Sequence, residues 1–142
     1  MSEVLTPETF AFVLANELKR AARSQNFVTL VLLEPGAGER ESAASEIASL
    51  VARELRETDL LAIEGPVVSM VLLDTDLQNS KRVIDRVMGR LEHYQFTAPV
   101  DLLVGAACCP THGADIDTLR RAAVEARTAL VRRSSHGTAH AQ

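Results

Sequence analysis

The chain has 142 residues, of which 46% are hydrophobic and 24% are charged, and its formal net charge is −4. A chain of this length can bury about two-thirds of the surface that it exposes when unfolded, so we expect one domain over residues 1–142. The negative charge argues against a general nucleic-acid binder, and no apolar stretch approaches the about 18 residues that a membrane span needs.

The amino-terminal part of the chain predicts a helix, a strand and a second helix. The first ten residues lack the basic start and apolar centre of a signal peptide, so we expect a cytoplasmic protein. Thr6-Pro7-Glu8 is typical of a helix start, and the apolar spacing after it predicts a helix to about Arg23. The apolar run Phe27–Leu33 ends at a proline and a glycine, which predicts a buried central strand. Residues Ser42–Leu55 have the spacing of an amphipathic helix.

The middle of the chain predicts a hairpin followed by a helix. Two apolar strands, Leu60–Ile63 and Val67–Leu73, flank the turn residues Gly65-Pro66. Residues Leu77–His93 repeat apolar side chains at helical spacing, with basic residues elsewhere on the helix.

The carboxy-terminal part predicts one more strand and one more helix. Residues Val100–Cys109 form the last strong apolar run, and a final helix is expected to begin near Asp115 and to continue through Leu130. From about residue 134 the composition is that of a flexible tail. This tail and the intact Met1 start lead us to expect a natural single-domain product.

Without its first and last helices, the chain has the order β-α-β-β-α-β. This order is typical of the ferredoxin-like arrangement, an α+β fold in which an antiparallel sheet of four strands carries the helices on one face. We expect the additional amino- and carboxy-terminal helices to wrap around this core.

The usual catalytic and metal-binding constellations are absent from the sequence. The segment EPGAGER, residues 34–40, lacks both the lysine ending of a phosphate loop and the third glycine of a dinucleotide turn. The four histidines are scattered, and the neighbouring Cys108 and Cys109 would point to opposite faces of a strand. We therefore expect no cofactor, no metal and no disulfide.

Several motifs in order resemble the GGDEF domain, the diguanylate cyclase module. They are R-x-x-D-x-x-A-x-x-G over Arg56–Gly65, then LLDTD, then LLVGAACCPTHGADIDTLRRAA. The likeness extends from about Phe10 to Arg133. It implies a nucleotidyl-cyclase palm, which has the order of strands and helices predicted above, and a place in bacterial signalling.

The departures from the family pattern imply that this chain is not an enzyme. The five positions of the family's metal-binding hairpin turn are Gly65-Pro66-Val67-Val68-Ser69 here, so both carboxylates are replaced by valine, which cannot ligate Mg²⁺. Glu34 stands where the family has a metal-binding Asp. The segment between Glu34 and Arg56 has no Asn or Asp to hold guanine, and the family's lysine is not found near Leu130.

The resemblance implies that the family's inhibitory site for cyclic di-GMP is retained in this sequence. The resemblance places Arg56 and Asp59 in its R-x-x-D motif, Arg86 on the helix after the hairpin, and Arg20 as the residue that a second protomer contributes. A carboxylate can accept hydrogen bonds from the N1–H and N2–H of guanine, and a guanidinium can face O6 and N7 or clamp a phosphate. The resemblance thus implies a dinucleotide site at these four residues.

Two functions are open at this stage. The first is a non-catalytic cyclic di-GMP receptor that signals through a ligand-linked homodimer or through an unknown protein partner. The second is a degenerate GGDEF-fold interaction module without a ligand, in which Arg56 and Asp59 form only a local surface ion pair. In the second case the residues that would dock a protein partner are Arg120, Arg121, Arg132 and Arg133.

Overall fold

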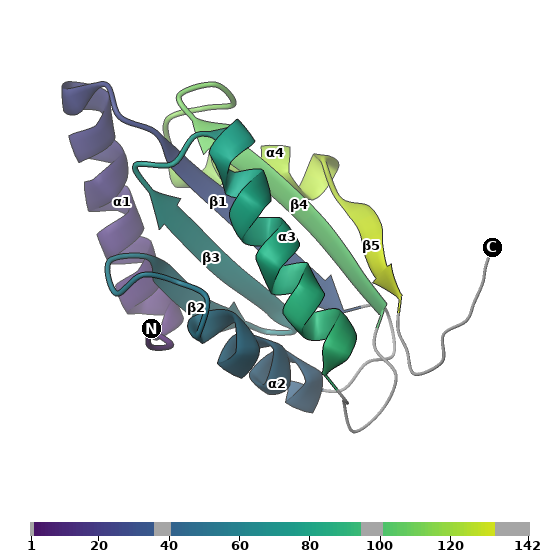
Figure 1. Cartoon of the computed structure of the whole chain (residues 1–142). Coiled ribbons are helices and arrows are strands. Elements are labelled where there is room, and N and C mark those ends of the chain that lie inside the picture. The colour runs from purple at the N-terminus through teal and green to yellow at the C-terminus, as the bar shows by residue number, and fades with distance from the viewer. Residues whose placement is uncertain (1, 36–40, 95–100, 133–142) are drawn as a thin grey trace.

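A computed structural model describes residues 2–35, 41–94 and 101–132 of the chain. The fold is α+β, with one antiparallel sheet of five strands in the order β2-β3-β1-β4-β5 (Figure 1). In chain order the elements are α1 (Pro7–Ser24), β1 (Val28–Pro35), α2 (Glu41–Ala52), β2 (Leu60–Glu64), β3 (Val67–Leu73), α3 (Leu77–His93), β4 (Asp101–Cys109), α4 (Ile116–Glu125) and β5 (Thr128–Arg132).

The first four strands and the helices α2 and α3 form the βαββαβ core that the sequence predicts. Strand β1 is central and pairs with both β3 and β4, and β2 pairs with β3 alone within the sheet. The amino-terminal segment lies along the outer edge of β2, where the Leu5 amide donates to the Leu61 carbonyl at 2.7 Å. The ferredoxin-like palm expected from the sequence is therefore confirmed.

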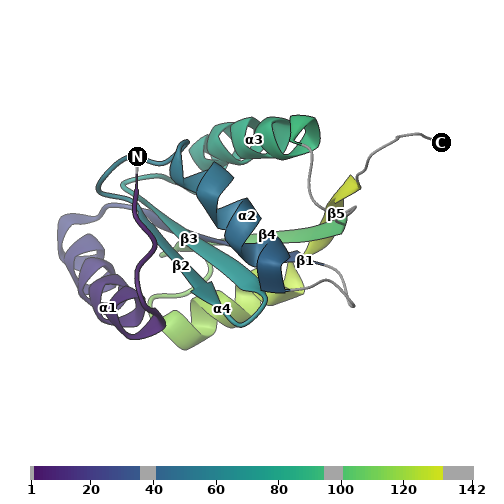
Figure 2. The same cartoon turned by 90° about the horizontal axis from the view of Figure 1, so that it is seen from below.

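Helices cover both faces of the sheet, two on each side (Figure 2). Helices α2 and α3 lie together on one face, and α1 and α4 lie on the other. The amino- and carboxy-terminal helices expected to wrap the core thus pair with each other across the face that α2 and α3 leave open. No helix in the described parts of the chain is both long and apolar enough to cross a membrane.

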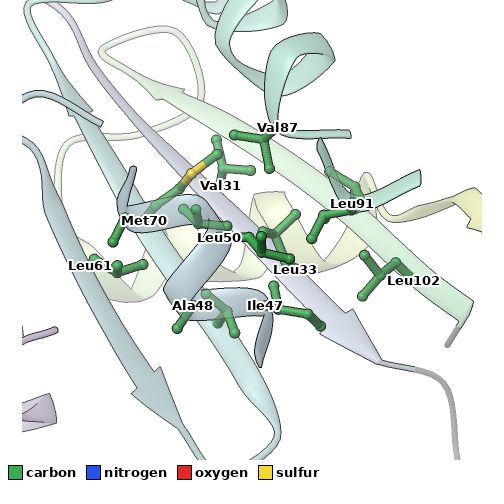
Figure 3. Close-up of a cluster of buried hydrophobic side chains, with 14 of the residues drawn as sticks. Val31, Leu33, Ile47, Ala48, Leu50, Leu61, Met70, Val87, Leu91 and Leu102 are labelled. Atoms are coloured by element: carbon green, nitrogen blue, oxygen red, sulfur yellow. The ribbon is translucent and has the colours of Figure 1, made fainter. Parts of the chain in front are cut away.

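The core between the sheet and the helices α2 and α3 is built from branched and linear aliphatic side chains (Figure 3). Strand β1 contributes Val31 and Leu33, and α3 contributes Val87 and Leu91, all of which are at most 2% exposed. Because alternate residues of a strand point to opposite faces, the intervening residues of β1 enter the second core.

The second core lies between the sheet and the helices α1 and α4. Leu30 of β1 contacts a cluster that includes Phe10 and Leu14 of α1 and Leu119 of α4, each 0% exposed. Strand β1 is consequently buried on both faces. This explains why its sequence is a continuous apolar run instead of an alternating one.

Side-chain caps fix where three helices begin. Thr6 caps α1 by accepting a hydrogen bond from the Thr9 amide, and Pro7 occupies the first turn, where its missing N–H costs nothing. Asp76 and Asp115 cap α3 and α4 in the same way. The start and the end of α3 lie at the residues that the sequence predicts.

The expected end of the last helix is wrong. Helix α4 ends at Glu125, and residues 128–132, which the spacing to Leu130 assigned to that helix, form the edge strand β5 beside β4. Pairing with β5 satisfies the backbone groups on the open edge of β4, which a longer helix would leave without strand partners. Thr128 and Val131 are also β-branched and suit a strand.

The packing of α4 on β4 depends on a glycine and can be tested there. A Cβ added at Gly105 would lie 2.0 Å from the backbone oxygen of Ala123, so we expect Gly105→Ala to lower the free energy of unfolding by about 1–3 kcal/mol. The matched control is Gly89→Ala in α3, where a Cβ would meet nothing within 4 Å, and we expect it to gain up to about 1 kcal/mol. Urea denaturation measures both, and equal stability of the two variants would contradict the close approach.

Candidate ligand site

The R-x-x-D segment forms a tight turn between α2 and β2. The Asp59 amide donates to the Arg56 carbonyl at 3.0 Å, and the Arg56 amide donates to Oδ2 of Asp59 at 3.0 Å. The other carboxylate oxygen, Oδ1, accepts from the amide of Leu73 at 3.1 Å, at the end of β3. Asp59 is only 4% exposed, so its carboxylate fastens the turn to the sheet from inside the protein.

The Arg56 guanidinium lies over this buried carboxylate. Nε donates to Oδ2 of Asp59 at 3.3 Å and Nη2 donates to Oδ1 at 3.1 Å, while Nη2 also donates to the Leu73 carbonyl at 2.6 Å. The hydrogen bond with Asp59 raises the pKa of the guanidinium, which therefore keeps its charge. The side chain nevertheless remains 58% exposed. It is a cation held in one orientation at the protein surface.

The geometry gives Arg56 and Asp59 different relations to a ligand. Both oxygens of Asp59 already accept hydrogen bonds from the protein, so pairing with a guanine edge would require the carboxylate to release Arg56. Arg56 makes its contacts through Nε and Nη2 and keeps an exposed flank. In this structure Arg56 is the accessible member of the pair, and Asp59 positions it.

Arg20 lies on α1 near the same turn of the same protomer. Its Nη2 is 2.7 Å from Oε1 of Glu17 and 3.7 Å from Oδ1 of Asp74, the residue after β3. The charge of Asp74 also contributes to the raised pKa of Arg56, after the larger effect of the hydrogen bond with Asp59. The carboxylate of Asp74 therefore interacts with the charges of both Arg20 and Arg56. Whether Arg20 reaches a second protomer stays a prediction.

Arg86 is held by a different carboxylate from the one that holds Arg56. Its Nε donates to Oε1 of Glu54 at 2.8 Å and its Nη2 donates to the Glu54 carbonyl at 2.8 Å, while Arg90 donates to Oε2 at 2.7 Å. The Glu54 side chain is 8% exposed. Burial raises the pKa of Glu54, but the hydrogen bonds from Arg90 and Arg86 outweigh it and bring the pKa below its usual value.

Two carboxylates near the turn between β2 and β3 are paired with arginines from the region of α4. Glu34 at the end of β1 forms an ion pair with Arg127. Glu64 at the end of β2 accepts from Ser69 Oγ at 3.0 Å and from Arg120 Nη2 at 2.7 Å. Glu34 and Arg127 are separated by 93 positions in the sequence, and Glu64 and Arg120 by 56. No local spacing in the sequence therefore indicates these pairs.

This region does not fit the divalent ions that the palm fold implies. Each carboxylate already has a guanidinium as its counter-charge, and the two positions after the turn are Val67 and Val68, which offer no oxygen ligand. Among the described residues no group of three His, Cys, Asp or Glu side chains is arranged to hold a metal.

No family model and no curated protein matches the sequence of this chain.

Comparison by structure finds GGDEF domains. The chain superposes on a DGC protein from Thermotoga maritima with a TM-score of 0.76 and 14% identity, covering 89% of this chain and 98% of that chain. The GGDEF domain of YfiN from Pseudomonas aeruginosa gives a TM-score of 0.72 and 18% identity, with 88% and 83% covered. The coiled coil and GGDEF domain of DgcB from Caulobacter crescentus, in complex with c-di-GMP, gives 0.70 and 10%, with 87% and 74% covered. This chain has the fold of a GGDEF domain.

Proposed function

We propose that the protein is a non-catalytic receptor for cyclic di-GMP, bound at Arg56 with Asp59, Arg86 and Arg20 in support. The observation that carries this proposal is the state of Arg56, whose guanidinium is fixed by a buried carboxylate yet 58% exposed. A pre-oriented guanidinium loses little conformational entropy when it binds, and its planar fork matches both the O6/N7 edge of guanine and a phosphate.

The charges around Arg56 suit a dianionic dinucleotide. Arg20 approaches the same turn from α1, and Arg86 lies on α3 with its side chain 52% exposed. A second copy of the chain could present its Arg20 to ligand held by the first, which would link two protomers. Such a ligand would shift the population between monomer and dimer by its difference in affinity for the two states. The structural neighbour DgcB was solved with the same dinucleotide.

The lack of catalysis is supported by the two carboxylates near the turn between β2 and β3. Phosphoryl transfer with two metal ions requires carboxylates that are free to coordinate both ions. Glu34 and Glu64 instead bond to Arg127 and Arg120, and the positions of the family's acidic residues are valines. We infer that GTP is not cyclised.

A second candidate function is a ligand-free interaction module, and one observation favours it. Each arginine of the proposed site already has a carboxylate partner within the chain: Glu17 for Arg20, Asp59 for Arg56 and Glu54 for Arg86. These pairs would stabilise the fold without any ligand. Binding experiments separate the two functions.

We expect cyclic di-GMP to bind the wild-type protein in isothermal titration calorimetry, and Arg56→Ala to weaken binding about tenfold or more. A hydrogen bond to a charged group contributes about 1.5–3 kcal/mol, which corresponds to that factor. Arg121→Ala, an exposed arginine on α4, is the matched control and should bind as the wild type does. No heat from the wild-type protein at high ligand concentration would exclude the receptor and favour the interaction module.

Asp59→Asn should destabilise the protein even without ligand, by about 1–3 kcal/mol. The substitution removes the charge opposite Arg56 and turns one acceptor into a donor that faces backbone N–H groups. Asp85→Asn, an exposed position on α3, should change stability by less than about 0.5 kcal/mol. Thermal unfolding monitored by circular dichroism gives both values, and an unchanged Asp59→Asn would contradict the role of the carboxylate in the turn.

We expect no product when the protein is incubated with GTP and Mg²⁺ or Mn²⁺. The carboxylates that would hold the ions are replaced by valine or paired with arginine, so the triphosphate has no metal cage. Chromatography of the nucleotides, with an active diguanylate cyclase as the positive control, makes the measurement. Any turnover that scales with protein concentration would show that the hairpin still supports catalysis.

A further inference from the structure

A groove of about 630 Å³ runs between α2 and α3 on the face away from α1 and α4. Pockets that hold small molecules commonly have volumes of about 300–1,000 Å³. The groove does not include Arg56 or Asp59. Its lining comprises Glu46, Ser49, Leu50, Arg53, Glu54, Arg86, Gly89, Arg90, His93 and Tyr94.

Two guanidiniums stand side by side in this groove because a buried carboxylate holds them. Arg86 and Arg90, one helical turn apart on α3, donate through Nε to the two oxygens of Glu54. Their side chains remain 52% and 56% exposed. In the described part of the chain Arg90 makes no hydrogen bond through its terminal nitrogens, so these donors remain for a ligand.

A third cation lines the groove directly after the end of α2. Arg53 is exposed, lines the groove and forms no ion pair with any described residue. The lining therefore holds three arginines against two glutamates, and the charge of Glu54 is already directed at Arg86 and Arg90. In a protein of net charge −4, a groove lining with one more arginine than glutamate is a local excess of positive charge.

A glycine in the groove has no explanation in the packing of the helix. Gly89 lies inside α3, where glycine costs about 1 kcal/mol relative to alanine, and a Cβ at this position would meet nothing within 4 Å. The absence of a Cβ at Gly89 keeps the wall of the groove open between Arg86 and Arg90. Internal contacts therefore do not require a glycine at this position.

We propose that the α2–α3 groove binds a phosphate monoester carried on a small organic group. The phosphate lies among Arg53, Arg86 and Arg90, since guanidinium forks bind phosphate oxygens through paired hydrogen bonds. The rest of the groove, beside Leu50, Gly89 and Tyr94, is larger than a phosphate needs and takes the organic group. The groove shares Arg86 with the proposed cyclic di-GMP site, but Arg53, Gly89 and Arg90 lie outside that site and carry this inference independently.

The test is isothermal titration of the full chain at low ionic strength with 5′-AMP as the probe and adenosine as the ligand control. We expect AMP to bind and adenosine not to bind. Arg90→Gln and Arg53→Gln should each weaken AMP binding about tenfold, the loss of a charge-assisted hydrogen bond. Arg82→Gln, on α3 but outside the groove, is the matched control and should leave the affinity unchanged within about twofold.

Two further variants separate a binding role from a structural one. Gly89→Ala should raise the melting temperature and yet weaken AMP binding, because the methyl group narrows the groove. Arg56→Ala should leave AMP binding unchanged, so failure of the dinucleotide proposal and failure of this one are distinguishable.

The proposal is overturned if the wild-type protein does not bind AMP at millimolar concentration, or if neither Arg53→Gln nor Arg90→Gln weakens binding. The Arg53 side chain makes no hydrogen bond or ion pair with a described residue, so its substitution tests the groove even where Arg90→Gln impairs folding. A second experiment, co-sedimentation with vesicles that contain phosphatidic acid, tests whether the phosphate belongs to a lipid headgroup. Binding to those vesicles without binding to AMP would assign the site to a lipid headgroup and contradict a soluble ligand.

Discussion

The buried carboxylate of Asp59 determines how the turn before β2 is built. It accepts hydrogen bonds from the amides of Arg56 and Leu73 and from the Arg56 guanidinium, and it thereby joins the end of α2, the start of β2 and the end of β3. A buried carboxylate is costly unless its oxygens are satisfied, so these segments must keep their relative positions. The orientation of Arg56 at the surface is a direct consequence.

The same device recurs around the molecule with different partners. Glu54 holds Arg86 and Arg90 between α2 and α3. Glu34 and Glu64, near the turn between β2 and β3, hold arginines from the α4 region. In a palm with metal ions, cations in solution would neutralise the hairpin acids. Here arginines of the same chain supply the counter-charge of Glu34 and Glu64.

Most of the fold could be predicted from local patterns, and the main failure has a clear cause. The helix α3 and the hairpin strands lie where the local patterns put them, because α3 buries one apolar face and the two strands are short apolar runs separated by Gly65-Pro66. The segment up to Leu130 also fits helical spacing, but β4 offers an open edge that only exists once the sheet has formed. A long-range pairing therefore overrode a local preference.

For the site, the sequence by itself determined which residues are present: an arginine and an aspartate three apart before the hairpin, and two valines after its turn. Spacing along the chain specifies these because the turn is local. Only the tertiary structure decided that Asp59 is buried while Arg56 is exposed, that Arg86 belongs to Glu54, and that Glu34 and Glu64 meet arginines far away in sequence. Burial and charge pairing arise from the packing of distant segments, and no pattern within one segment carries that information.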